Sequence, residues 1–402
     1  MKIAVVGAGV AGLGAARALV GGGHEVVLYE AAAQPGGHVH TVLAEGHAID
    51  MGFIVCNRER YPLFFRLLDE LGVRTRPTTM SFSVSLPARD LEWGSASLSS
   101  LFAQRRRLLD GQHWRFLLEV MAFLRRARRD LDLGRITGSL DEYVQGELRD
   151  AFAIPLAAAL WSLAPDRCGD FPAETFVRFL DQHGMLRTIR PLAWHTVEGG
   201  SRRYVDALVA QLRTGHCELR LGTRVTRITR LGGITVVTDR QDRYDRLILA
   251  THANTALDLL DDPTADERRV LGAFAYSTNR TVLHTDRSFL PRAAAAHASW
   301  NYVADPQTSK VAVTYSMTRL QGLPDAPYLV TLNPRSEPRG ILHDVTFTHP
   351  QFDAPALAAQ AELPRLANTR CTYYAGAHFG FGFHEDGLRA GYAAAARAMA
   401  DG

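Results

Sequence analysis

Lysine is almost absent from this chain of 402 residues, in which arginine supplies nearly all of the positive charge. Only Lys2 and Lys310 occur. The 45 basic and 42 acidic side chains give a formal net charge of +3, so the composition does not favour a polyanion, and we expect no nucleic acid as a partner. No run of about 18 apolar residues is present, which argues against a membrane-spanning helix.

Cysteine is also scarce, and the spacing of the four thiols is not that of a metal site. We therefore expect no bound metal and a reducing compartment. Met1 leads directly into the first predicted strand, so we expect no signal peptide and a cytoplasmic protein. Because 47% of the residues are hydrophobic, the chain can bury a core large enough for two domains.

The start of the chain has the pattern of a strand, a glycine-rich turn and a helix. Apolar residues 3–6 run into Gly7, Gly9 and Gly12, which have the spacing GxGxxG. Gly7 permits the tight turn, Gly9 lets a pyrophosphate approach the backbone, and Gly12 lets the helix pack closely on the sheet. A second predicted strand ends at Glu30, about 20 residues further on, where a carboxylate would bind the ribose of a dinucleotide.

A second pair of glycines follows this motif. Gly36, Gly37 and His38 come soon after the second strand, and a nicotinamide site has no use for such a pair. The stretch resembles the start of the FAD-dependent amine oxidase superfamily, which includes phytoene desaturase, protoporphyrinogen oxidase and polyunsaturated fatty acid isomerase. The resemblance implies that FAD is the cofactor and that this turn passes close to its diphosphate, with His38 where the family usually has arginine.

Three later segments extend the resemblance along most of the chain. Residues 197–208 look like the family's Gly-Gly turn and helix that lead back into the FAD domain. Residues 219–228 look like the strands beside the adenine, where the backbone of Val225 would read the base edge. Residues 244–252 look like the last central strand of that domain.

The carboxy-terminal part resembles the family's flavin motif, in residues 372–377 and 387–391. The resemblance assigns to the flavin Gly376, Ala377, Gly387 and Leu388. Glu385 and Asp386 are expected to be first-turn or capping acids of the last helix rather than catalytic bases. Some relatives attach the flavin through a thioether near this end. Here we expect noncovalent FAD, with Cys371 as a buried structural thiol.

These observations predict an α/β protein with a Rossmann-like FAD-binding domain and an interleaved α+β substrate domain. The pattern turns helical from Pro77 to Leu192, and it alternates from Phe274 to Phe347, which predicts an antiparallel sheet. We assign residues 1–76, 195–272 and 365–402 to the FAD-binding domain, and residues 77–194 and 273–364 to the substrate domain.

Candidate catalytic residues lie beside an aromatic, glycine-rich turn that should be close to the flavin. His378 and His384 flank this turn, and each is a candidate either for moving a proton or for holding the turn as a neutral hydrogen-bond donor. The substrate pocket would be lined from alternating strand positions. We assign to it Trp300, Tyr302, Tyr315 and Met317.

Function follows from the flavin and from the scarcity of lysine. Many amine-oxidising relatives place a lysine near the flavin, but Lys2 falls in the first strand and Lys310 at a predicted strand edge. We expect an FAD-dependent oxidoreductase that acts on a C–H bond of an apolar substrate, an acyl chain or similar lipid, by desaturation, oxidation or double-bond isomerisation. An amine or amino-acid oxidase that releases hydrogen peroxide is the first alternative. A redox-silent protein that binds FAD and lipid is the second, and the oligomeric state stays open.

One helical segment, residues 101–130, is rich in arginine and in large apolar residues. A basic amphipathic segment of this kind can lie on an anionic membrane surface, which would suit a lipid substrate and a membrane-associated enzyme. An ordinary surface helix with a buried apolar stripe and a solvated arginine face shows the same periodicity, and it is the interpretation we favour from the sequence.

Overall fold

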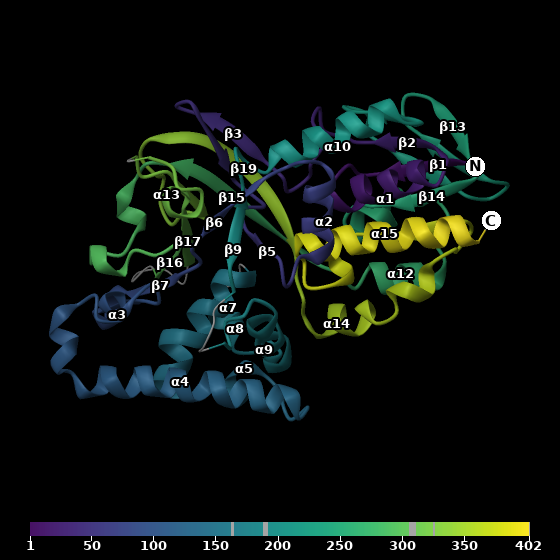
Figure 1. Cartoon of the computed structure of the whole chain (residues 1–402). Helices are drawn as coiled ribbons and strands as arrows, with labels where there is room; N and C mark the ends of the chain where they lie inside the picture. Colours follow the sequence, from purple (N-terminus) through teal and green to yellow (C-terminus); the bar gives the residue numbers. More distant parts are fainter. Residues whose placement is uncertain (162–164, 188–191, 305–310, 325, 402) are drawn as a thin grey trace.

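Two β-sheets organise the molecule, and the chain passes between them several times (Figure 1). The computed structural model describes residues 1–161, 165–187, 192–304, 311–324 and 326–401. Both described ends of the chain lie on the same side, next to the smaller of the two sheets. Among the described residues, no helix has the length and apolar character needed to cross a membrane.

The smaller sheet has five parallel strands. Its three central strands are runs of buried, mainly aliphatic residues, which is typical of a parallel sheet. Its order is β10 (Cys217–Arg220), β2 (Glu25–Tyr29), β1 (Lys2–Val6), β14 (Arg246–Leu249) and β20 (Thr372–Tyr374). Helices α1 (Val10–Gly21) and α15 (His384–Ala400) pack closely together at Gly391. A Cβ at this position would lie 2.1 Å from the carbonyl oxygen of Ala11, so only glycine allows the approach. The amino-terminal motif and the last helix therefore meet at one place.

The larger sheet has seven strands, which come from two distant parts of the chain. Its order is β19 (Ile341–Pro350), β15 (Tyr276–His284), β18 (Leu329–Leu332), β17 (Val311–Ser316), β16 (Trp300–Ala304), β7 (Phe82–Leu86) and β8 (Leu91–Gly94). The predicted antiparallel sheet between Phe274 and Phe347 is confirmed, and only the junction of β16 with β7 is parallel.

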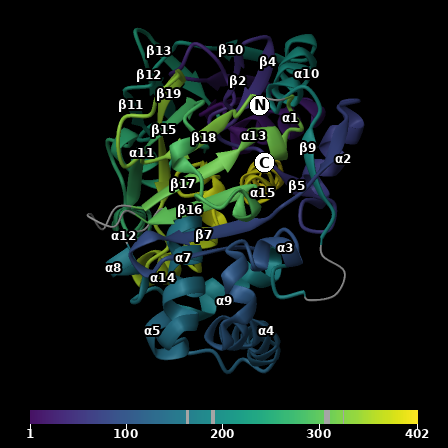
Figure 2. The same ribbon diagram turned by 90° about the vertical axis from the view of Figure 1, so that its left-hand side faces the viewer.

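The sequence predicts helices from Pro77 to Leu192, but the structure has strands at the start of this segment. The segment begins with the end of β6 (Thr75–Thr78), followed by β7 and β8. In β7, Phe82, Val84 and Leu86 alternate with serines, and the strand pairs with β16. Helices follow from there and lie below strands β7 and β16 in Figure 2. The main ones are α4 (Gly111–Asp132), α5 (Leu140–Tyr143), α7 (Ile154–Trp161) and α9 (Ala173–Gln182). Ser139 caps α5, since its hydroxyl accepts from the Glu142 amide at 3.3 Å.

Smaller elements complete the fold. The remaining strands are β5 (Cys56–Asn57), β9 (Trp194–Val197) and β6 (Thr75–Thr78), the hairpin β3 (Thr41–Ala44) and β4 (His47–Asp50), and the ribbon β11 (Arg227–Thr229), β12 (Ile234–Val237) and β13 (Gln241–Tyr244). Other helices are α2 (Pro62–Glu70), α3 (Leu98–Leu101), α6 (Gly146–Leu148), α8 (Pro165–Cys168), α10 (Arg202–Thr214), α11 (Ala253–Leu259), α12 (Ala265–Leu271), α13 (Met317–Leu320) and α14 (Ala354–Gln360). All strands of the five-stranded sheet fall in the ranges predicted for the FAD-binding domain, and all strands of the seven-stranded sheet fall in those predicted for the substrate domain. The domain boundaries themselves stay a prediction.

Candidate active site

A cavity of about 580 Å³ runs from the turn between β1 and α1 to the face of the seven-stranded sheet. Gly7 and Glu30 line one end of it, and Trp300 and Tyr315 line the other. We call the first the nucleotide end and the second the substrate end. The cavity thus takes its walls from both sheets.

At the nucleotide end, the backbone shapes the wall. Gly7 has a φ of +99°, and a Cβ there would lie 2.7 Å from the carbonyl oxygen of Ala250. A Cβ on Gly12 would lie 1.8 Å from the carbonyl oxygen of Gly7, so the helix packs as closely as the motif predicts, although Gly12 itself does not line the cavity. A Cβ on Gly9 would meet nothing within 4 Å, which leaves open space at this position.

The start of α1 leaves hydrogen-bond donors free for an anion. Gly9 is its N-cap residue and has no side-chain cap, and the first turn contains no acid. Free amides at a helix amino terminus form an anion-binding site. The amide of Gly36 donates to the carbonyl of Ala8 at 2.8 Å, which holds the turn of Gly36 and Gly37 beside this helix start.

Glu30 and Val225 lie further along the nucleotide end. The Glu30 carboxylate accepts from the amides of Ala8 at 2.8 Å and Ala32 at 2.9 Å, and a carboxylate can accept further bonds. Among the described residues, none forms a hydrogen bond with the backbone amide or carbonyl of Val225. Both groups are therefore free for a ligand that enters this end.

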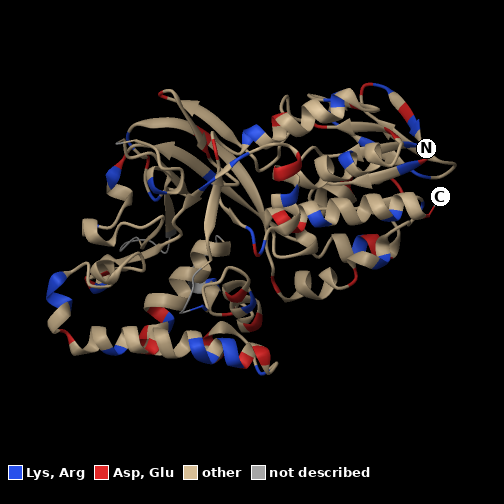
Figure 3. Cartoon of the chain, viewed as in Figure 1, with Lys and Arg blue, Asp and Glu red and all other residues tan. Residues whose placement is uncertain are grey.

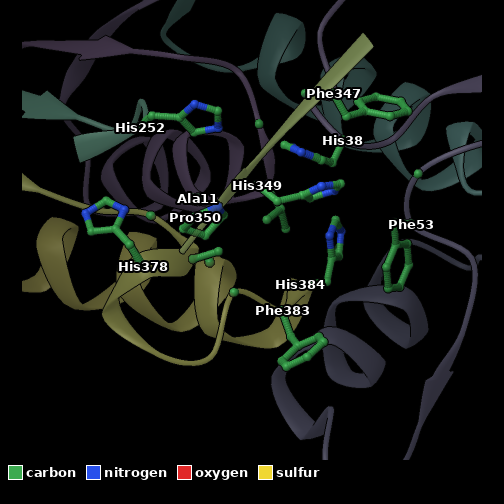
Figure 4. A pocket seen from close by; sticks show the side chains of 18 of the residues that line it. Ala11, His38, Phe53, His252, Phe347, His349, Pro350, His378, Phe383 and His384 are labelled. Atoms are coloured by element: carbon green, nitrogen blue, oxygen red, sulfur yellow. The ribbon is translucent and has the colours of Figure 1, made fainter. Parts of the chain in front are cut away.

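Six histidines line the cavity, and Figure 4 shows most of them gathered around it. They are His38, His183, His252, His349, His378 and His384. Burial lowers the pKa of His252 to about 4 and the pKa of His349, His378 and His384 to about 3, and it lowers that of His38 as well. These imidazoles are therefore neutral at neutral pH. In the described part of the chain, no group of three His, Cys, Asp or Glu side chains has a geometry that could hold a metal ion.

The two candidate catalytic histidines differ in their contacts. His384 is the first residue of α15, its Nε2 is hydrogen-bonded to the Tyr204 hydroxyl at 2.5 Å, and its ring stacks on Phe53 with centroids 3.8 Å apart. His378 is buried, and its Nε2 has no hydrogen-bond partner among the described residues. The contacts and the lowered pKa of His384 favour the neutral, positional role over proton transfer.

The two acids of the last helix are caps, as predicted. Glu385 is buried and accepts from the amides of Leu63 and Phe64 at 3.0 and 2.9 Å, so it caps helix α2. Asp386 accepts from the amides of Phe381 and Phe383 and closes the turn before its own helix. Both carboxylates therefore hold backbone amides, and Asp386 also accepts from Arg389 at 3.0 Å.

The substrate end is aromatic and apolar. Trp300 and Tyr315 face each other across β16 and β17, with ring centroids 5.4 Å apart. Other aromatic residues that line the cavity are Phe53, Trp161, Trp194, Phe347, Phe352, Phe381 and Phe383. Among the described residues that line the cavity, Glu30 at the nucleotide end is the sole acid.

Two of the residues assigned to the pocket lie elsewhere. Tyr302 is buried in the hydrophobic cluster of the helical segment and does not line the cavity. Met317 is not on a strand, because β17 ends at Ser316 and Met317 begins α13; its side chain is buried in another hydrophobic cluster. Lys2 lies at the start of β1, where it pairs with Glu25 at 3.5 Å, and Lys310 falls outside the described residues.

A model of the family "Flavin containing amine oxidoreductase" matches residues 10–332. The chain belongs to this family. It is an FAD-dependent oxidoreductase, and FAD is its cofactor.

Comparisons with individual proteins add the fold and one local likeness. The chain is 44% identical to the zeta-carotene desaturase of Synechocystis sp. over 75 residues, which are 18% of this chain and only 15% of the desaturase. The structure is similar to putrescine oxidase bound to putrescine, with a TM-score of 0.71 at 15% identity, over 100% of this chain and 99% of the oxidase. It is also similar to the CLA-producing fatty acid isomerase from P. acnes, with a TM-score of 0.68 at 18% identity, over 98% of both chains. At such identities, the structural likeness shows the fold.

The residues present fit FAD. The cradle of Gly7 and Gly9 has room for a diphosphate, and Glu30 and Val225 offer groups for the ribose and the base. The unpaired Nε2 of buried His378 needs a partner that the described residues do not supply. Gly37, His38, Gly376, Ala377 and Gly387 line the same cavity.

Three residues singled out in the sequence have surroundings that differ from the family pattern or from our expectation. His38 is no fixed cation, since its Nε2 lies 3.0 Å from the carbonyl of Thr348 and burial lowers its pKa. The Leu388 side chain is buried in the core. The Gly387 amide already donates to the carbonyl of Phe383, so the helical hydrogen bonds of α15 begin there. The free amides of α15 therefore belong to residues 384–386, which precede Leu388. Cys371 is exposed rather than buried, so that prediction is wrong. It lies in a loop with a φ of 57° that precedes β20, and it does not line the cavity.

Sequence reasoning missed His252, His349 and Tyr204. His252 follows β14 and His349 is on β19, and only the packing of the two sheets brings them together with His38. The alternation of Phe347 and His349 along β19 is the one signal that places both on the same face.

Proposed function

We propose that this enzyme acts on a C–H bond of an apolar substrate, an acyl chain or a similar lipid, by desaturation, oxidation or double-bond isomerisation. The observation that carries the proposal is the substrate end, which is aromatic and has no carboxylate among the described residues that line it. An apolar wall of this kind favours an apolar chain, because burial of hydrocarbon is favourable and burial of an unpaired charge is costly.

The roles of the chain's own residues follow from the cavity. FAD supplies the hydride acceptor, and the protein places the substrate bond and excludes water. We propose that Trp300 and Tyr315 hold the hydrocarbon, and that Gly7, Gly9, Gly36, Gly37 and Glu30 hold the dinucleotide part of the cofactor. His384, kept in place by Tyr204 and Phe53, would orient the ring end as a neutral imidazole.

An amine oxidase is the rival function, and the family name and the fold of putrescine oxidase favour it. A cationic amine would find aromatic rings at the substrate end but no counter-ion among the described residues that line it. The one described lysine lies away from the cavity. The desaturase and isomerase likenesses support the lipid instead.

The test is product analysis on the purified holoenzyme. The enzyme is incubated with an artificial electron acceptor and one of two substrate sets, either an unsaturated phospholipid or a panel of primary amines and amino acids. The products are then identified by mass spectrometry. We expect a change in the number or position of double bonds, or an added oxygen, in the acyl chain. Hydrogen peroxide and an aldehyde from amines alone would show the rival function, and no turnover of either class would favour the redox-silent alternative.

A further inference from the structure

The outer side of helix α4 exposes large apolar residues. Among the described residues, eleven large hydrophobic side chains are exposed, and seven of them lie in residues 98–133. Leu109 is 95% exposed and Leu118 is 67% exposed, and Trp114 is 47% exposed. Such a concentration on one segment marks an interaction surface rather than scattered exposure.

Helix α4 has two apolar faces. Phe116, Phe123 and Ala127 are buried against the helical cluster. Trp114, Leu118 and Met121, which are four and three residues apart, lie on the opposite side. An ordinary surface helix has one buried stripe and a solvated polar face, so the interpretation that the sequence favoured does not account for this second stripe.

The same segment is strongly basic. Residues 98–133 contain eight arginines and four acids, a net charge of +4, whereas the other residues contain 37 basic and 38 acidic side chains, a net charge of −1. Figure 3 shows the basic positions at the turn before α4 and along α4, at the outer edge of the molecule. Several arginines pair with neighbouring acids, but Arg105 and Arg125 are exposed and have no ion pair among the described residues. Arg126 instead donates to the Tyr143 carbonyl and lies over the Phe123 ring, on the buried side of α4.

We propose that the outer face of η2 (Arg105–Leu109) and α4 docks the enzyme on the surface of an anionic lipid bilayer. Leu108, Leu109, Trp114, Leu118 and Met121 enter the headgroup region, and the unpaired arginines bind lipid phosphates. A second copy of the chain is a poorer occupant, because a two-fold contact would bring two segments of charge +4 together. Docking of this kind does not depend on which substrate enters the cavity.

Flotation of the holoenzyme with lipid vesicles tests the proposal. We expect binding to vesicles of phosphatidylcholine mixed with phosphatidylglycerol, weakening with added salt, and little binding to phosphatidylcholine alone. The pair Leu109→Ser and Leu118→Ser should weaken binding by roughly tenfold or more, since two leucines lose their burial. The matched control is Leu231→Ser, an exposed leucine outside the face, and it should bind as the wild type does.

A second readout uses the position of Trp114. Its emission should shift to the blue with anionic vesicles, and the shift should disappear in Trp114→Phe. Arg125→Gln should weaken binding, while Arg66→Gln, an exposed arginine on α2, should not. Equal binding of the leucine pair and the wild type, equal binding to both kinds of vesicle, or no binding to anionic vesicles would overturn the proposal. So would a dimer in light scattering that the leucine pair abolishes, because the face would then bind a second copy.

Discussion

The two ends of the cavity are built by different means. At the nucleotide end, Gly7, Gly9 and Gly36 shape the wall through the backbone and through the absence of side chains. At the substrate end, Trp300, Tyr315 and neighbouring rings from several strands shape it through side-chain volume. The first design accepts almost no change, and the second accepts graded change, which is how one cofactor site can serve different substrates.

The largest effect is expected for Gly12→Ala. Its Cβ would lie 1.8 Å from the carbonyl oxygen of Gly7, so α1 must move off the sheet, at a cost of about 3 kcal/mol in the free energy of unfolding. Urea denaturation of the FAD-free protein measures it. Gly21→Ala, at the end of the same helix, meets nothing within 4 Å and should change stability by less than about 0.5 kcal/mol. Equal stability of the two variants would contradict the close packing.

Gly9→Ala should separate cofactor binding from folding. A Cβ at Gly9 meets no protein atom within 4 Å, so the FAD-free protein should keep its stability. The methyl group would enter the space of the diphosphate, and we expect FAD affinity to fall by roughly a hundredfold, from the lost approach of the phosphate to the helix amides. Isothermal titration of the FAD-free protein gives the affinity. Unchanged binding would place the diphosphate elsewhere.

At the substrate end, Trp300→Phe should leave FAD content unchanged and alter kcat/KM for the lipid by roughly tenfold, because one wall of the cavity recedes. Tyr302→Phe is the control, two residues along the same strand but outside the cavity lining. Steady-state kinetics with both variants measure the contrast. If the two changed kcat/KM alike, Trp300 would not be a wall of the pocket.

The buried histidines predict how stability depends on pH. Their folded-state pKa of about 3 to 4 is below the ordinary 6.5, so the unfolded chain binds more protons, and stability is complete above pH 6.5 and falls as the pH drops toward 4. Each contributes a slope of up to about 1.4 kcal/mol per pH unit. Asp50 is buried and its pKa is raised to about 6, so below that pH the folded chain binds a proton at Asp50 that the unfolded chain binds only at lower pH. This dependence has the opposite sign and cancels the slope of about one histidine.

His349→Asn checks this slope. His349 accepts from the side-chain amide of Asn279 at 2.8 Å, a bond that protonation would break. Without this histidine, the free energy of unfolding, measured by thermal unfolding between pH 4 and 6.5, should depend less steeply on pH. The decrease should equal the slope that one histidine contributes. An unchanged slope would show that His349 does not titrate on unfolding.

The same contrast explains what the sequence could predict. Gly7, Gly12 and Glu30 were found because backbone requirements leave a fixed spacing in the chain. His252 and His349 were not, since the register between separate strands brings them to the cavity and no local pattern reports it. Met317 was misplaced because a strand end has no strong signal, and β7 was overlooked beside the helical pattern that follows it.

The most direct measurement is the absorbance of the bound FAD when substrate is added without oxygen. The account predicts that an unsaturated phospholipid bleaches or shifts the flavin band and that putrescine and other primary amines leave it unchanged. Bleaching by amines, with no response to the lipid, would contradict it.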